Sequence, residues 1–165
     1  MQRSIYIAYG SNLNKKQMKD RCPDSKKIGA TILEGYKLNF RGTRRGFGVA
    51  NIERCKGSIV PVGIWSISRY DELELDIYEG YPNLYMKDFL PFNYGGKRYE
   101  GMVYIMRPGH PVMKPAKHYE NTIRAGYMDF GISSEYLDNA LVNCENQEKD
   151  ADFWRKYYDL IDVEA

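Results

Sequence analysis

Two short segments of this chain combine residue types that could do chemistry. The segment Tyr9–Leu13 (YGSNL) follows an apolar, strand-like run. In such a turn, successive backbone N–H groups can bind an anion or a carboxylate. The segment Asp76–Gly80 (DIYEG) ends a predicted helix, where a carboxylate is unfavourable by roughly 0.3–1 kcal/mol. If Glu79 were partly buried there, its pKa would rise toward a value useful for acid–base catalysis. Taken alone, the two segments are better explained as an ordinary turn and a solvated surface glutamate.

Three arginines lie among glycines between two predicted strands. Arg41, Arg44 and Arg45 could clamp a carboxylate of a substrate, or they could simply make a hairpin tip soluble, as such clusters more often do. If they bind a substrate that is held by one carboxylate elsewhere in the site, they hint weakly that this substrate carries a second carboxylate. The glycine spacing around them matches neither a P-loop nor a dinucleotide-binding fingerprint.

Metal and nucleophile chemistry are poorly supported by the sequence. His110 and His118 lack cysteine or carboxylate partners at the spacing of metal ligands. No GxSxG elbow surrounds Ser11, so a serine nucleophile is not indicated. The three cysteines form no CxxC pair and are odd in number, which argues against a disulfide scaffold or a structural zinc site. We therefore expect no metal site.

Length and composition limit the class of protein. The 165 residues, 43% of them hydrophobic, are enough for one domain spanning residues 1–165. A net charge of +2 argues against a nucleic-acid partner. The longest apolar stretch, residues 57–68, is interrupted by Pro61 and is far shorter than the roughly 20 residues of a membrane span. The N-terminal residues show no signal-peptide pattern, so we expect a cytoplasmic protein, either a monomer or a homodimer.

The elements that would hold the two segments are strands first and helices later. Strand-like runs cover residues 4–9, 28–33, 36–40, 47–52 and 60–67, and residues 84–92 and 97–106 flank a hairpin signal at Asn93–Gly96. Short helices are predicted over residues 14–21 and from Ser68 to Gly80, the latter with Tyr70, Leu73 and Ile77 on one face. Three more are predicted: one with Pro115 at its first position, one from Ser133 or Ser134, and one after Asp150. This segregation favours an α+β fold, and the many tyrosines and glycines fit either a small barrel or a curved sheet with a polar pocket.

Several segments, in order along the chain, resemble the gamma-glutamylcyclotransferase-like family. Ile7–Leu13 (IAYGSNL) resembles the opening of that family, and Asp76-x-x-Glu79-Gly80 resembles its catalytic D-x-x-E-G segment. Between them, Gly63–Ile67 is similar to the strand that leads into the catalytic helix. Residues 84–106 fit the strands that follow, and Pro115–Tyr136 is similar to the C-terminal helical signature with its substrate-contacting tyrosine, here Tyr119. The resemblance covers nearly the whole chain.

The resemblance implies a fold, a small mixed or antiparallel β-barrel with surrounding helices, and a reaction. Family enzymes let the α-amino group of a γ-glutamyl compound attack its own γ-carbonyl, which gives 5-oxoproline and releases an amine or amino acid. Because this attack is intramolecular, no cofactor and no metal would be needed, and Glu79 would be the general base and acid. The substrate-binding residues would be Tyr9, Gly10, Ser11, Asn12, Leu13, Tyr85 and Tyr119. The partner would be a small γ-glutamyl molecule whose leaving group stays open, and the alternative is a non-catalytic small-molecule binder that uses the same pocket.

Overall fold

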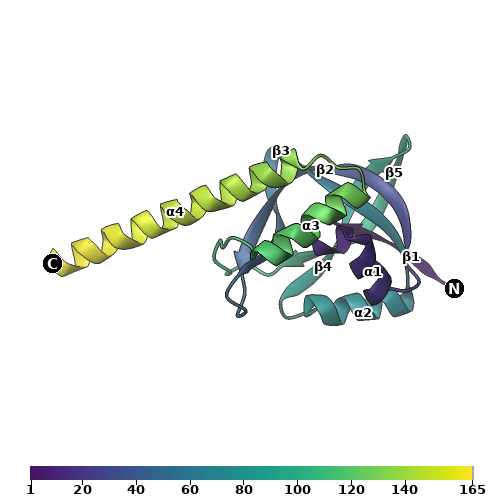
Figure 1. Cartoon of the computed structure of the whole chain (residues 1–165), viewed down its shortest axis with the longest axis horizontal. Coiled ribbons are helices and arrows are strands. Elements are labelled where there is room, and N and C mark those ends of the chain that lie inside the picture. Colours follow the sequence, from purple (N-terminus) through teal and green to yellow (C-terminus); the bar gives the residue numbers. More distant parts are fainter. Residues whose placement is uncertain (165) are drawn as a thin grey trace.

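Five strands form one mixed sheet in the order β2-β3-β1-β5-β4 (Figure 1). The structure, a computed structural model, describes residues 1–164. Neighbouring strands pair antiparallel except β1 and β5, which are parallel. The strands are β1 (Arg3–Ala8), β2 (Lys26–Gly42), β3 (Gly48–Ser68), β4 (Tyr85–Tyr94) and β5 (Lys97–Met106). The helices are the 3-10 turn η1 (Ser11–Leu13), α1 (Lys15–Arg21), α2 (Arg69–Glu79), α3 (Lys117–Asp129) and α4 (Glu135–Glu164). The α+β class and the mixed sheet are confirmed.

The sheet curves toward a barrel but is not closed by backbone pairing. Its two edge strands are β2 and β4. Two hydrogen bonds from side chains cross the gap between them: Thr31 Oγ1 donates to the Asn93 carbonyl at 2.6 Å, and the Tyr94 hydroxyl donates to the Ile28 carbonyl at 3.2 Å. The predicted barrel is therefore an open one, in which the edges meet through side chains rather than through a ladder.

Two long strands replace the four short ones predicted between residues 28 and 67. β2 and β3 each bend without ending, because the register shifts between Glu34 and Tyr36. Gly35 and Gly57 lie at this irregularity with φ angles of 80° and 84°, which a side chain would disfavour. The bend lets one hairpin both pair with β1 and reach out to form a wall of the cavity described below.

Local capping chemistry defines α2 as predicted. The Ser68 hydroxyl accepts a hydrogen bond from the Asp71 N–H, and the Asp71 carboxylate accepts one from the Ser68 N–H, both at 3.1 Å. This reciprocal pair is a capping box. Gly80 ends the helix in the left-handed conformation with φ 63°. Glu79 is consequently fixed as the last helical residue.

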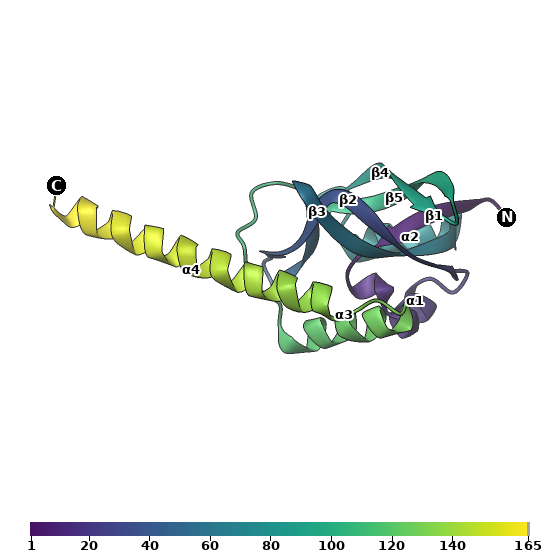
Figure 2. The ribbon, with the colours of Figure 1, turned by 90° about the horizontal axis from the view of Figure 1, so that it is seen from above.

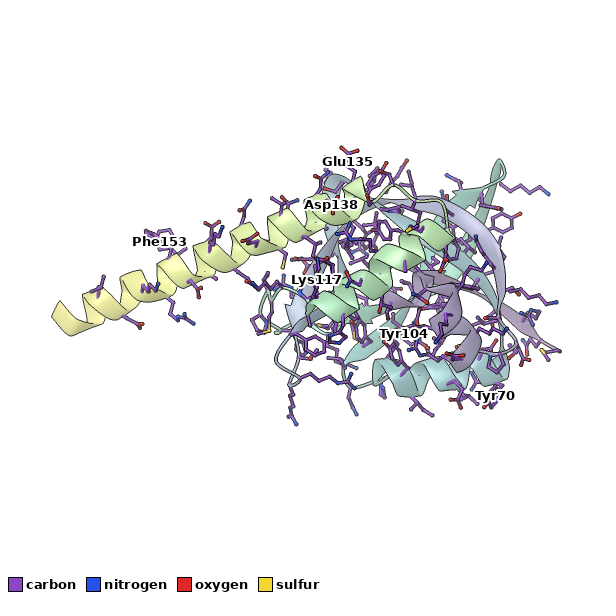
Figure 3. The ribbon with its side chains drawn as sticks, in the orientation of Figure 1. Tyr70, Tyr104, Lys117, Glu135, Asp138 and Phe153 are labelled. Atoms are coloured by element: carbon purple, nitrogen blue, oxygen red, sulfur yellow. The ribbon has the colours of Figure 1, made fainter. Side chains whose placement is uncertain are left out.

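The apolar face predicted for α2 is not the face that packs on the protein. Leu75 and Asp71 are buried, whereas Tyr70, Leu73 and Ile77 are exposed, the last to 76%. Figure 3 shows Tyr70 on the outer side of the helix. The spacing of the three residues is helical, but the side of the helix that is buried carries Asp71 and Leu75 instead.

The C-terminal helices differ most from the prediction. α3 begins at Lys117 after an Ala116 N-cap, so Pro115 precedes the helix instead of occupying its first position. The prediction of a separate helix after Asp150 was wrong, because α4 runs unbroken from Glu135 to Glu164. Its first turns lie beside α3, where Arg124 and Asp138 form an ion pair at 2.9 Å. The remainder, which carries Phe153, extends away from the body of the protein (Figures 1, 2 and 3). None of the helices in residues 1–164 has the length and apolarity needed to cross a membrane.

Candidate active site

A cavity of about 450 Å³ opens where the end of β1, the β2–β3 hairpin, the end of α2 and α3 converge. Its size is within the range of pockets that bind small molecules. It is lined mainly by tyrosines and small polar residues: Tyr6, Tyr9, Gly10, Ser11, Asn12, Thr43, Arg44, Arg45, Val49, Ala50, Tyr78, Glu79, Asn83, Leu84, Tyr85, Tyr104, His110 and Tyr119. Seven of the eight predicted site residues are therefore brought together.

Leu13 is the predicted site residue that lies elsewhere. Its side chain is fully buried in the hydrophobic core. Its N–H is also engaged, because it donates to the Gly10 carbonyl at 3.1 Å within the turn of η1. Leu13 therefore anchors the loop in the hydrophobic core, while Gly10, Ser11 and Asn12 line the cavity.

Glu79 is the only carboxylate among the cavity-lining residues that the structure describes. One of its oxygens, Oε1, accepts a hydrogen bond from Asn12 Nδ2 at 3.1 Å. Burial raises the pKa of Glu79 to about 7, although the nearby positive charge of Arg21 opposes the rise. At neutral pH this side chain is thus poised to take up a proton and to give one back, as a catalyst that does both requires.

Asn12 holds this carboxylate in a chain of side-chain contacts. Its amide nitrogen donates to the Tyr6 hydroxyl at 2.9 Å as well as to Glu79. Its amide oxygen accepts a hydrogen bond from the guanidinium of Arg21. The Arg21 guanidinium also lies 3.3 Å from the centre of the Tyr78 ring, a cation–π contact. Both ends of the Asn12 amide are therefore used, which fixes the orientation of the group that binds Glu79.

The tyrosine hydroxyls around the cavity are tied to the backbone. Tyr9 donates to the Tyr104 carbonyl and Tyr85 donates to the Ala50 carbonyl, each at 2.6 Å. The Tyr119 hydroxyl accepts a hydrogen bond from the Ala50 N–H at 3.0 Å. Burial raises the pKa of Tyr9, Tyr85 and Tyr119, so all three stay neutral. They form rigid walls and offer hydroxyl groups rather than charges to a ligand.

Close approach of the backbone explains why a glycine follows Tyr9. A Cβ atom on Gly10 would lie 2.9 Å from the Ala50 Cβ and 3.5 Å from the Tyr119 hydroxyl. The η1 loop can therefore approach β3 and α3 only without a side chain at this position.

Asp76, the first residue of the D-x-x-E-G segment, has a structural role. It accepts a hydrogen bond from the Tyr104 hydroxyl at 2.5 Å and forms an ion pair with Lys87 at 2.8 Å. Figure 3 shows Tyr104 between the sheet and α2, where this contact joins them. Asp76 therefore anchors the helix to β4 and β5, and by doing so it positions Glu79.

The three arginines between β2 and β3 have different positions. Arg41 forms an ion pair with Glu53 at 2.6 Å and donates to the His110 carbonyl at 3.0 Å, so it binds the protein itself. Arg44 and Arg45 are exposed, and both line the cavity. The predicted contact of these arginines with a substrate carboxylate is therefore compatible with the positions of Arg44 and Arg45, but not with that of Arg41.

Several residues that line or support the cavity were not identified from the sequence. Tyr6, Tyr78 and Tyr104 line the cavity, and Arg21, which does not line it, holds Asn12 by a hydrogen bond. The abundance of tyrosine was the one signal, but it does not say which tyrosines converge. Arg21 lies nine positions after Asn12, on an exposed-looking helix, and nothing in the local pattern links the two.

Comparisons with known proteins agree with this geometry. The family model described as "Gamma-glutamyl cyclotransferase, AIG2-like" matches residues 6–126. A solved structure titled gamma-glutamyl cyclotransferase shares 24% identity with a TM-score of 0.74, over 84% of this chain and 86% of the other. An uncharacterized human protein gives the same identity and TM-score over 85% and 87%. YkqA from Bacillus subtilis shares 21% identity with a TM-score of 0.69, over 88% of this chain and 55% of YkqA.

These structural likenesses show the fold, since all three identities are below 25%. A search of curated proteins gave no match to this sequence. The family model is the stronger finding, because it spans most of the chain and includes both the η1 loop and Glu79. The chain belongs to the gamma-glutamyl cyclotransferase, AIG2-like family.

Proposed function

We propose that this protein cyclises a γ-glutamyl compound to 5-oxoproline and releases an amine or amino acid. The observation that carries the proposal is Glu79, a carboxylate with a pKa near 7 that lines a cavity of about 450 Å³. The family match supports the same reaction class.

The chemistry needs no protein nucleophile, because the substrate supplies its own. Its α-ammonium group first loses a proton to the ionised Glu79. The resulting amine attacks the γ-carbonyl carbon, forming the new C–N bond of a five-membered ring. Confining the glutamyl chain in a folded shape favours this step, since effective molarities of intramolecular reactions reach roughly 10⁵–10⁸ M.

The second half of the reaction returns the proton. Glu79 delivers its proton to the leaving nitrogen and then accepts the second proton from the ring nitrogen of the tetrahedral intermediate. The intermediate collapses, the original amide C–N bond breaks, and Glu79 passes this second proton to the released amine, which leaves as an ammonium group. One carboxylate thus serves as base and then as acid, and the protein ends in its starting state. Gly10, Ser11 and Asn12 line the same wall as Glu79 and would bind the glutamyl moiety there.

The test is mass-spectrometric detection of 5-oxoproline with wild-type protein and the Glu79→Gln variant on a panel of γ-glutamyl amino acids and γ-glutamylamines. We expect 5-oxoproline and the free leaving group in equal amounts from the wild type only. A matched control is Glu74→Gln, which makes the same chemical change on the same helix but outside the cavity.

The second candidate, a binding protein without turnover, makes a different prediction. It would show ligand-dependent thermal stabilisation by members of the panel without any product. A cavity carboxylate of raised pKa favours the enzyme, because a binder has no need to retain an ionisable group that is costly to bury.

A further inference from the structure

The loop that joins β2 and β3 forms one wall of the cavity. Thr43, Arg44 and Arg45 line the cavity there, together with His110 from the segment after β5. The loop is held in place, because the His110 Nδ1 atom lies 3.0 Å from the Gly42 carbonyl, within hydrogen-bond distance. Arg44 and Arg45 are therefore carried by a loop that is anchored at its β2 end.

Arg44 and Arg45 differ from Arg41 in their contacts with charged groups. Within residues 1–164, neither the Arg44 nor the Arg45 side chain forms an ion pair or a hydrogen bond. Arg41 provides the contrast, because Glu53 neutralises it at 2.6 Å. Glu79, the one carboxylate lining the described cavity, is already bound to Asn12 on a different wall.

An unpaired arginine pair at a ligand cavity is suited to a carboxylate. The guanidinium fork presents parallel N–H groups that match the two oxygens of such a group. In the proposed reaction the glutamyl half lies beside Glu79 and the η1 loop, since its amine must reach the base. The leaving group then extends from the scissile nitrogen into the rest of the cavity, whose walls include Arg44 and Arg45.

We propose that Arg44 and Arg45 determine substrate specificity by binding a carboxylate on the leaving group. This inference rests on the proposed function. It defines the preferred leaving group as an amino acid or a peptide bearing a carboxylate, in preference to a simple amine. Both arginines are exposed, so added salt weakens the contact.

The experiment compares two substrates that differ only in this carboxylate, γ-glutamylalanine and γ-glutamylethylamide. The measured quantity is the ratio of their kcat/KM values, in wild type and in the double variant Arg44→Gln, Arg45→Gln. We expect the wild-type ratio to favour the alanine compound and to fall at least about tenfold in the variant, the lower end for hydrogen bonds to charged groups. Raising the NaCl concentration lowers the wild-type ratio as well.

The control is the double variant Lys97→Gln, Arg98→Gln. It also removes two positive charges, but from exposed residues of β5 that do not line the cavity. It therefore preserves the ratio, whereas a loss of the ratio in both double variants would show a long-range effect of net charge and would overturn the assignment.

The remaining outcomes are distinguishable. If the Arg44, Arg45 variant loses activity equally on both substrates, the arginines bind the glutamyl half and the specificity proposal is wrong. An unchanged ratio would also overturn it while leaving cyclisation intact. If neither substrate yields 5-oxoproline with wild-type protein, the proposed function fails, and this inference fails with it.

Discussion

Replacing Glu79 with glutamine should make the protein more stable at neutral and alkaline pH. The folded protein holds this carboxyl at a pKa of about 7, against 4.5 for the unperturbed group. At about 1.4 kcal/mol per pH unit, ionising Glu79 costs the folded state about 3 kcal/mol. Because part of the side chain reaches solvent, we expect the measurable value to be about 2–3 kcal/mol.

The sign of the effect follows from proton binding. Between pH 4.5 and pH 7 the unfolded chain has released the proton of this group and the folded protein retains it. The free energy of unfolding of the wild type therefore falls as pH rises through this window. Glutamine carries no titrating proton, and its side-chain oxygen can still accept the hydrogen bond from Asn12.

Urea denaturation of both proteins at several pH values from 4.5 to 8 measures this difference. We expect the stability of the variant relative to the wild type to be lowest at pH 4.5, and to grow by about 2–3 kcal/mol by pH 8. Glu74→Gln should show no such growth. A difference that stays flat across the whole range would refute the claim that Glu79 is held at a raised pKa.

Three further substitutions test the surroundings of Glu79. Arg21→Met removes the positive charge that opposes the raised pKa of Glu79, so the acidic limb of the kcat/KM profile should move to higher pH, and an unmoved limb would contradict this role. Gly10→Ala places a Cβ 2.9 Å from the Ala50 Cβ, and we expect a loss of about 1–3 kcal/mol in urea denaturation together with weaker ligand binding. Ser68→Ala removes half of the capping box and should cost about 1 kcal/mol in the same assay, while an unchanged midpoint would mean that the cap is dispensable.

A further prediction concerns the backbone N–H groups of the η1 loop. Ser11→Pro removes one backbone N–H from the loop and should weaken the binding of a γ-glutamyl ligand, measured by calorimetry on folded protein. Unchanged affinity would show that the loop serves only as a turn.

Local chemistry made parts of this fold predictable. Ser68 and Gly80 set the limits of α2 through capping that depends only on neighbouring residues. The hairpin at Asn93–Gly96 is confirmed for the same reason, with Gly95 and Gly96 at φ angles of 57° and 76°. Such features need no knowledge of distant segments.

Features that depend on tertiary packing were not predictable. The helical spacing of Tyr70, Leu73 and Ile77 is real, but which face of α2 meets the sheet is decided by partners such as Lys87. The unbroken course of α4 past Asp150 reflects the lack of a helix breaker there, although aspartate also favours helix starts.

The candidate site shows the same division. The residue types of Glu79 and the η1 loop drew attention to them, but these residues, like Tyr85 and Tyr119, were assigned to a site only through the family resemblance. The contact of Arg21 with Asn12, and the convergence of Tyr6, Tyr78 and Tyr104, arise only when strands and helices distant in sequence are assembled. Charge pairing likewise separates Arg41 from Arg44 and Arg45 only in the folded protein.

The most direct test of the central claim is the kcat of Glu79→Gln on the best γ-glutamyl substrate, measured beside Glu74→Gln as 5-oxoproline formed per second. We predict that the Glu79 variant binds the substrate but turns it over at least about 100-fold more slowly, the lower end for lost general acid–base catalysis. The Glu74 variant should retain wild-type turnover. A Glu79→Gln protein with near-normal kcat would contradict the assignment of Glu79 as the base and acid.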